Sequence, residues 1–392
     1  MPKKILLLRF TPYDTNYNSY NVQEIGIGKA FCRLGYDYDH ICFRRENPKE
    51  WVFYEYNGCK ARYIEYPRFR LLRMGLNMDI CKKNFLDKYD IVICREYYQI
   101  MSYIVSKNCS HASLYSGPYW NMFMFKFVSP IYDFLFTKSI NKQMNCKFVK
   151  SVLAKEFLER KGYTQVLNIG VGLDMERFNN ETDVLESTKQ LMEFMSLNPC
   201  LLFVGQLNEN KNFPLLVEIY SRIIKIHPEI RFVMIGKPVQ TMIGKLMRKT
   251  NESYVDGILS KYPENVSEGI LRINRIDNSQ LKYIYPLAKA FLLPSKKEIF
   301  GMVLLEAMYL GAPVVTSKNG GSMTLIDKKS TGQMISEYDA ELWTNAVLKY
   351  LENPLYAENI RLNARTIVER EYTWDAIAIK MLKALERKNN VN

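Results

Sequence analysis

The stretch "LLPSKKEIFGMVLLEAMYLGAPVVTSKNGGSMTLI", residues 292–326, decides the fold. It reads as an apolar strand, a loop that holds Glu298, a helix over 302–310, a second apolar strand over 312–317 and a glycine pair at 320–321. Strands that alternate with helices in this way build a parallel α/β sheet. In such sheets, ligands bind beside the carboxyl ends of the strands, and the loop of Glu298 lies at one of those ends.

Two carboxylates in this stretch are candidates for ligand binding. Side chains on a helix tilt toward its N-terminus, so Glu306 is predicted to point toward the loop that carries Glu298. An ionised carboxylate accepts hydrogen bonds from sugar hydroxyls, and the free N–H groups where the helix opens at Gly301 suit phosphates. The alternative is an acidic helix start that complements the helix dipole by less than about 1 kcal/mol. The glycine pair and Pro313, which stops the helix sharply, favour the binding site over that alternative.

The same alternation extends through most of the chain. Before Cys200, the apolar runs 4–10, 38–43, 91–95, 112–116 and 146–151 are predicted strands, and after it the pattern starts again. Helices are expected over 214–225, 278–288 and 302–310, and Gln240–Ser267 is expected to hold a helix and a loop. The sequence therefore predicts two successive α/β sheets that join between Phe178 and Cys200.

Composition sets the class of protein. The 392 residues are 47% hydrophobic and 24% charged, which is typical of a globular chain with two or three domains. Lys and Arg exceed Asp and Glu by 54 to 41, and residues 1–150 hold 23 of these bases but only 13 of the acids. An anionic partner of the first half is expected. Eight cysteines that are never two residues apart, with three histidines, argue against zinc and for buried thiols in a reducing, cytoplasmic compartment. No apolar run is long enough to span a membrane.

Residues 294–321 resemble the donor-domain signature of the retaining group-one glycosyltransferases of the GT-B fold. The segment "FVGQLNENKNFPLLVEIY" at 203–220 resembles the family's phosphate-binding strand and loop, and "NIGVGLDMERF" at 168–178 its interdomain segment. The resemblance implies two Rossmann-like, doubly wound parallel-sheet domains that face each other across a cleft. Residues 1–179 would form the acceptor domain, with a C-terminal helix at 372–392 crossing back onto it, and 180–371 would form the nucleotide-sugar donor domain.

The resemblance also assigns roles. It implies that Glu298 and Lys211 are catalytic: Glu298 would hold hydroxyls of the transferred sugar, and Lys211 would neutralise the departing diphosphate, so that neither a metal nor another cofactor is expected. Glu306 would accept hydrogen bonds from the ribose. The other donor-binding residues expected are Gly205, Gln206, Arg275, Phe300, Gly301 and Met302.

Two positions depart from the family pattern. Gln206 stands where relatives usually carry an Arg, which removes one positive charge from the diphosphate site. Ser116 and Gly117 stand where many relatives carry a His, and His111 lies before that strand, so no catalytic His is assigned.

Two weaker signals have competing interpretations. The basic, aromatic stretch 107–150 fits either an anionic membrane surface or a core helix whose lysines are solvated. The run "GIGKAF" at 26–31 partly imitates a dinucleotide-binding loop, but helix packing explains it better because the third glycine is missing. No nucleic-acid recognition module is present, so nucleic acid is not expected as a partner.

These observations predict a retaining, metal-independent hexosyltransferase. It would move a hexose or N-acetylhexosamine from a nucleotide diphosphate sugar, such as a UDP-sugar, to a hydroxyl of a glycan or lipid-linked acceptor in cell-envelope polysaccharide synthesis. It would be cytoplasmic and peripheral on the inner membrane face. The alternatives are a nucleotide-sugar epimerase on the same fold and a non-catalytic protein that binds sugar nucleotides.

Overall fold

The computed structural model describes residues 2–11, 22–44, 47–71, 74–239, 251–326 and 330–389. The chain divides into two compact units, one of Met1–Asp174 with Glu371–Asn392 and one of Met175–Arg370. The sequence placed these boundaries at 179 and 371. Residues 175–179 fall in the second unit, where Phe178 packs with its ring centroid 6.1 Å from that of Tyr309.

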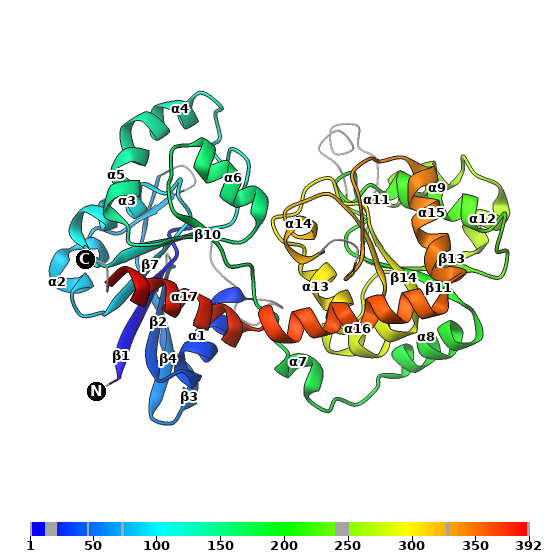
Figure 1. Cartoon of the computed structure of the whole chain (residues 1–392), viewed down its shortest axis with the longest axis horizontal. Helices are drawn as coiled ribbons and strands as arrows, with labels where there is room; N and C mark the ends of the chain where they lie inside the picture. The colour runs from blue at the N-terminus through cyan, green and yellow to red at the C-terminus, as the bar shows by residue number, and fades with distance from the viewer. Residues whose placement is uncertain are drawn as a thin grey trace. The chain divides into compact units, whose positions relative to one another are not determined.

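The first unit is built on one large sheet (Figure 1). Its strand order is β10 (Val166–Asn168), β9 (Lys147–Val149), β8 (Ala112–Ser116), β7 (Ile91–Arg95), β1 (Lys3–Leu8), β2 (Tyr36–Phe43), β4 (Cys59–Tyr66) and β3 (Glu50–Tyr56). All neighbours pair in parallel except β3 and β4. Strands β1, β7 and β8 are buried almost throughout, as a parallel sheet covered on both faces requires.

One edge of this sheet is an antiparallel hairpin, which the sequence analysis did not predict. Strands β3 and β4 form a hairpin whose turn is Asn57-Gly58, with φ of 45° and 82°. Two left-handed residues in succession match the right-handed twist of the flanking strands, and Asn-Gly supplies them at little cost. A second small hairpin joins β5 (Phe69–Leu71) and β6 (Met74–Leu76).

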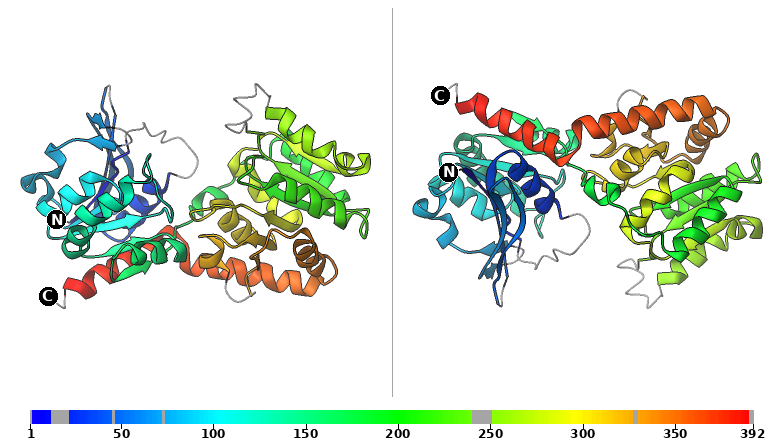
Figure 2. Two further views of the ribbon diagram at one scale, coloured as in Figure 1. Left: turned by 90° about the horizontal axis from the view of Figure 1, so that it is seen from above. Right: turned by 90° about the horizontal axis from the view of Figure 1, so that it is seen from below.

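The helices of the first unit cover both faces of its sheet (Figure 2). They are α1 (Gln23–Arg33), α2 (Lys83–Leu86), α3 (Ile100–Asn108), α4 (Val128–Tyr132), α5 (Lys138–Gln143), α6 (Val152–Arg160) and α17 (Trp374–Asn389), with a π-helical turn over Asp133–Thr137 and a 3-10 turn over Asp79–Cys81. The C-terminal helix α17 packs on α1, where a Cβ at Gly26 would lie 2.0 Å from the Trp374 indole nitrogen. The prediction that "GIGKAF" serves helix packing is confirmed.

The second unit has a fully parallel sheet. Its order is β13 (Ile270–Ile273), β12 (Arg231–Ile235), β11 (Cys200–Val204), β14 (Ala288–Leu293), β15 (Val314–Ser317) and β16 (Gln333–Ile335). Its helices are α7 (Glu176–Asn179), α8 (Glu186–Leu197), α9 (Phe213–Ile223), α11 (Asn251–Leu259), α12 (Glu264–Glu268), α13 (Met302–Tyr309), α14 (Ser322–Leu325), α15 (Ala340–Leu351) and α16 (Pro354–Glu371).

One predicted helix is wrong. Residues 278–288 form two 3-10 turns, Asn278–Tyr283 and Tyr285–Leu287, because Pro286 has no N–H with which to continue an α-helix. Within the predicted segment Gln240–Ser267, residues 240–250 lie outside the described residues, and the remainder holds α11 and α12 with a short turn between them.

All eight cysteines are buried, as the sequence predicts. Among the described residues, no helix combines the length and the apolar character needed to cross a bilayer.

Candidate functional site

Three loops meet at the carboxyl edge of the second sheet. They follow β11, β14 and β15, which are neighbours in that sheet. The Lys296 amide donates to the Asn210 carbonyl at 2.7 Å, which joins the first loop to the second. The Gly320 amide donates to the Glu298 carbonyl at 3.2 Å, which joins the second to the third. The sequence predicted ligand binding at this edge, and the loops that carry the candidate residues are tied together there.

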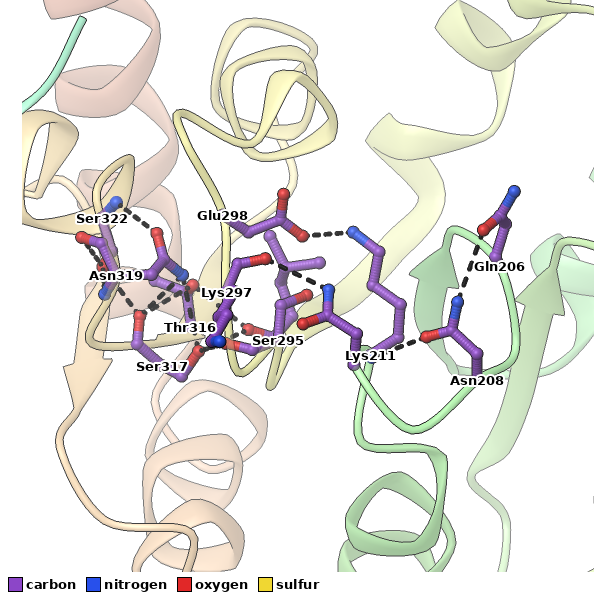
Figure 3. Close-up of polar contacts among 12 residues, drawn as sticks. Gln206, Asn208, Lys211, Ser295, Lys297, Glu298, Thr316, Ser317, Asn319 and Ser322 are labelled. Carbon is purple, nitrogen blue, oxygen red and sulfur yellow. Dashed lines mark hydrogen bonds and ion pairs between the residues drawn. The ribbon is translucent and has the colours of Figure 1, made fainter. Parts of the chain in front are cut away.

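Lys211 and Glu298 face each other at the centre of this edge (Figure 3). The Lys211 ammonium makes a short ion pair with a Glu298 carboxylate oxygen, and the two side chains are only 17% and 15% exposed. The Asn208 carboxamide oxygen accepts from the Lys211 amide at 2.9 Å, which fixes the turn that presents the lysine. The two residues assigned catalytic roles from the sequence are thus adjacent, 87 positions apart in the chain.

The third loop approaches the second closely through a glycine. A Cβ at Gly321 would lie 1.6 Å from the Phe300 carbonyl oxygen, so no other residue fits there without a backbone shift. Gly301 adopts φ of +75° where α13 opens, and Met302 is the first residue of that helix. The backbone of the predicted residues Phe300, Gly301 and Met302 is therefore held at a helix start beside the Lys211–Glu298 pair.

A cluster of hydroxyl and amide side chains fixes this third loop, and the sequence analysis missed it. The Ser322 hydroxyl donates to the Ser317 carbonyl at 2.7 Å, and the Ser317 hydroxyl donates to the Ser295 carbonyl at 2.5 Å. The Asn319 carboxamide oxygen accepts from the Ser322 amide at 3.0 Å. The polar run "TSKNGGS" at the end of a buried strand was the available signal.

Glu306 lies on α13 and is completely buried. Neither of its carboxylate oxygens has a hydrogen-bond partner among the described residues, so it makes no hydrogen bond to the loop of Glu298. Burial raises the pKa of this carboxyl well above its usual value. Burial therefore favours the protonated, uncharged form of Glu306, and a donor that reaches its oxygens finds acceptors that no described residue already uses.

Gly205 follows β11 and lies beside Lys211, because a Cβ at Gly205 would be 3.5 Å from the Lys211 Cε. Its amide donates to the Ile235 carbonyl at 2.9 Å. Gln206 is exposed and accepts from the Asn208 carboxamide at 3.4 Å. Arg275 follows β13, two strands away from β11, and its side chain is 76% exposed. A cavity of about 210 Å³ beside it is lined by Leu207, Gly236, Pro238, Arg272 and Asn274.

In the first unit, Glu96 contacts Ser116 and Gly117, the two residues that stand where many relatives of the resembled family carry a histidine. Its carboxylate accepts from the Ser116 hydroxyl at 3.1 Å and from the Gly117 amide at 3.2 Å. Glu96 follows β7 with φ of 70°, a left-handed conformation that is unusual for a residue with a side chain. A single glutamate at the end of a strand is not distinctive in the sequence, so its contact with Ser116 and Gly117 could not be predicted. The segment 11–26, which follows β1, lies partly outside the described residues, which leave out 12–21.

Comparisons with known proteins agree with this geometry. Residues 193–367 match the family model described as "Glycosyl transferases group 1". An uncharacterized glycosyltransferase of Methanocaldococcus jannaschii is 24% identical over 382 residues, which cover 90% of each chain. A D-inositol 3-phosphate glycosyltransferase of Jonesia denitrificans is 24% identical over 192 residues, covering 48% of this chain and 42% of the relative.

Solved structures show the same fold. Sucrose-phosphate synthase from Thermosynechococcus elongatus superposes with a TM-score of 0.69 over 100% of both chains at 19% identity. The Escherichia coli trehalose-6-phosphate protein bound with UDP-2-fluoro glucose gives 0.72 over 98% of this chain and 99% of its own, at 11% identity. The predicted fold class is confirmed. With two Rossmann-like units and the signature loops gathered at the edge of the second sheet, the chain has the GT-B fold, and residues 193–367 of its second unit match the group 1 glycosyltransferases.

Proposed function

We propose that the protein is a retaining hexosyltransferase that takes a hexose or N-acetylhexosamine from a nucleotide diphosphate sugar and attaches it to a hydroxyl. The observation that carries this proposal is the Lys211–Glu298 pair beside the start of α13, with the buried carboxyl of Glu306, which has no hydrogen-bond partner among the described residues, on the same helix. These groups supply a cation for the diphosphate, an acceptor for sugar hydroxyls and an acceptor for ribose hydroxyls. UDP is the first nucleotide to test, because an Anabaena structure that superposes with a TM-score of 0.67 is described as bound to UDP-glucose.

The arrangement supports electrostatic catalysis. The bond between the anomeric carbon and the diphosphate oxygen breaks, and the acceptor oxygen bonds to the same face of the sugar while its proton passes to the departing diphosphate. Lys211 and the free amides at the start of α13 stabilise the charge that develops on the diphosphate. Binding requires Lys211 to exchange Glu298 for phosphate, which leaves Glu298 free for the sugar. In this scheme the lysine takes the place of a metal ion.

The decisive experiment is transfer followed by nuclear magnetic resonance. The full chain is incubated with a UDP-hexose and candidate hydroxyl acceptors, and the anomeric configuration of the first product is read before it equilibrates. We expect the donor's configuration in the product. Inversion contradicts the retaining mechanism. Conversion of the donor without an acceptor identifies the epimerase alternative, and nucleotide binding without any reaction identifies the non-catalytic alternative.

We propose further that the acceptor is a glycan or lipid-linked molecule of cell-envelope assembly, met at an anionic membrane surface. The support is the segment 124–135, which we call the apolar face. Six of its large apolar side chains are at least half exposed: Met124, Phe125, Phe127, Ile131, Phe134 and Leu135. Lysines 126, 138 and 142 are exposed beside them. Apolar side chains among lysines are typical of a surface that lies on anionic lipid.

Sedimentation with anionic liposomes tests this surface. Each lysine near the membrane contributes about 1 kcal/mol, so replacing all three by Glu should weaken binding by roughly a hundredfold or more. The control replaces three exposed lysines elsewhere in the same unit, Lys82, Lys83 and Lys88. Equal loss in the control, or full retention in the first variant, contradicts a membrane role for the apolar face.

A further inference from the structure

A cavity of about 490 Å³ lies in the first unit, next to the carboxyl ends of β1 and β7. Its size is in the range of small-molecule binding sites. The walls come from the end of β1, the start of α3 and the segment 122–136, and they are mostly apolar, including Phe10, Ile100, Phe123, Phe125, Val128 and Phe136. Nothing in the donor site accounts for this cavity, because all its lining residues belong to the first unit.

One part of the cavity wall is polar, and two of its groups are buried without partners. Arg9, Arg95, Glu96 and Gln99 line the cavity. Gln99 is 5% exposed, and its side-chain oxygen has no hydrogen-bond partner among the described residues. The Arg95 Nε is likewise buried and unpartnered there, although another nitrogen of the same guanidinium bonds Glu24 at 2.5 Å. A ligand that carries both an acceptor and a donor satisfies these two groups.

The balance of charged side chains around the polar part of the cavity wall favours binding of an anion. The side chains of Arg9 and Arg95 stand against those of Glu24 and Glu96, and the buried Lys150 adds a positive charge whenever it is protonated. Burial, followed by repulsion from Arg95, lowers the pKa of Lys150 to about 7. An anionic group in the cavity supplies the missing negative charge.

The cavity is continuous with the apolar face. Met124 and Phe125 belong to both, and each is 50% exposed. An apolar chain held at the membrane surface by this face can therefore enter the cavity without crossing polar surface. Charge and shape together favour a single ligand with an apolar chain at one end and an anion at the other.

We propose that the cavity binds the apolar chain of an amphiphilic acceptor, with its anionic head beside Arg9 and Arg95. The role as an acceptor rests on the proposed function above, whereas the binding itself does not. The acceptor hydroxyl is then presented from the head, near the carboxyl ends of the strands of the first sheet.

Titration calorimetry on the full chain tests the proposal with farnesyl monophosphate, kept below its aggregation concentration, against farnesol and inorganic phosphate. We expect farnesyl monophosphate to bind most tightly. Phe125→Asp should weaken binding about tenfold or more, because it removes apolar contact from the cavity wall. Phe134→Asp is the matched control, since Phe134 is 87% exposed on the same segment and does not line the cavity.

The three ligands and the two variants distinguish the possible results. The proposal is overturned if farnesyl monophosphate does not bind, or binds Phe125→Asp as tightly as the wild type. If inorganic phosphate binds as tightly as farnesyl monophosphate, the cavity does not bind the apolar chain. If farnesol binds as tightly as farnesyl monophosphate, the anionic head does not contribute to binding. UDP binding, measured on the same preparations, tests the proposed function separately, because the donor site lies in the other unit.

Discussion

Glu306 should make the stability of the second unit depend on pH in a predictable direction. Its carboxyl is fully buried without a hydrogen-bond partner among the described residues, and burial raises its pKa in the folded state. In the unfolded chain it titrates near the ordinary value of about 4.3. The folded state therefore holds a proton that the unfolded state releases, so the group's contribution to stability is greatest in acid and is lost as pH rises.

The size of the effect follows from proton linkage. While the folded state keeps Glu306 protonated and the unfolded state does not, each pH unit lowers the free energy of unfolding by about 1.4 kcal/mol. Glu306→Gln keeps the shape but cannot titrate, so its stability relative to wild type should rise by that amount per unit above pH 5. Glu306→Ala should show the same slope but a lower stability at every pH, because it leaves a cavity.

Calorimetric unfolding of the full chain at pH 5, 6 and 7 measures this slope for the second unit. A free-energy difference between Glu306→Gln and wild type that stays constant over these pH values refutes the interpretation of Glu306 as a buried, unpaired acid. Adding UDP should reduce the slope, since ribose hydroxyls supply the missing donors.

Three further substitutions test the site and its supports. Lys211→Met should lower the transfer rate about a hundredfold or more, because the diphosphate loses its cation, while the exposed Lys296→Met should not; steady-state kinetics checks both. Gly321→Ala should lower both thermal stability and nucleotide affinity, since its Cβ meets a backbone carbonyl, whereas Gly257→Ala on α11 has open space and should be neutral or stabilising. Arg95→Leu should cost about 3–5 kcal/mol in denaturant unfolding, because it leaves the buried carboxylate of Glu24 without its closest cation; a loss below 1 kcal/mol contradicts that account.

The sequence predicted the second unit better than the first. Strands β11 and β14 of the second sheet are almost entirely apolar, so they stood out in the sequence, and the family signature marked Glu298 and Lys211. The pairing of these two side chains depends on how separate loops meet, which no local pattern records. The hairpin of β3 and β4 was missed although Asn57-Gly58 signalled it.

The first unit's functional features were harder to predict because they depend on tertiary packing. The stretch 107–150 was recognisably basic and aromatic, but its two interpretations differ only in which side chains face the core. The structure buries Tyr132 and Ile140 and exposes Phe127 and Phe134, so the stretch is part core and part surface. The contact of Glu96 with Ser116 requires a left-handed backbone that the residue type itself disfavours.

The central claim is a nucleotide-sugar site on the second unit, and thermal stability against UDP, GDP, ADP and CMP tests it most directly. A nucleotide present at 100 times its dissociation constant should stabilise the unit that binds it by about 2.7 kcal/mol. We predict stabilisation by one diphosphate, and its loss in Glu306→Ala. No stabilisation of the wild type by any of the four, or the same stabilisation in Glu306→Ala, contradicts the site described here.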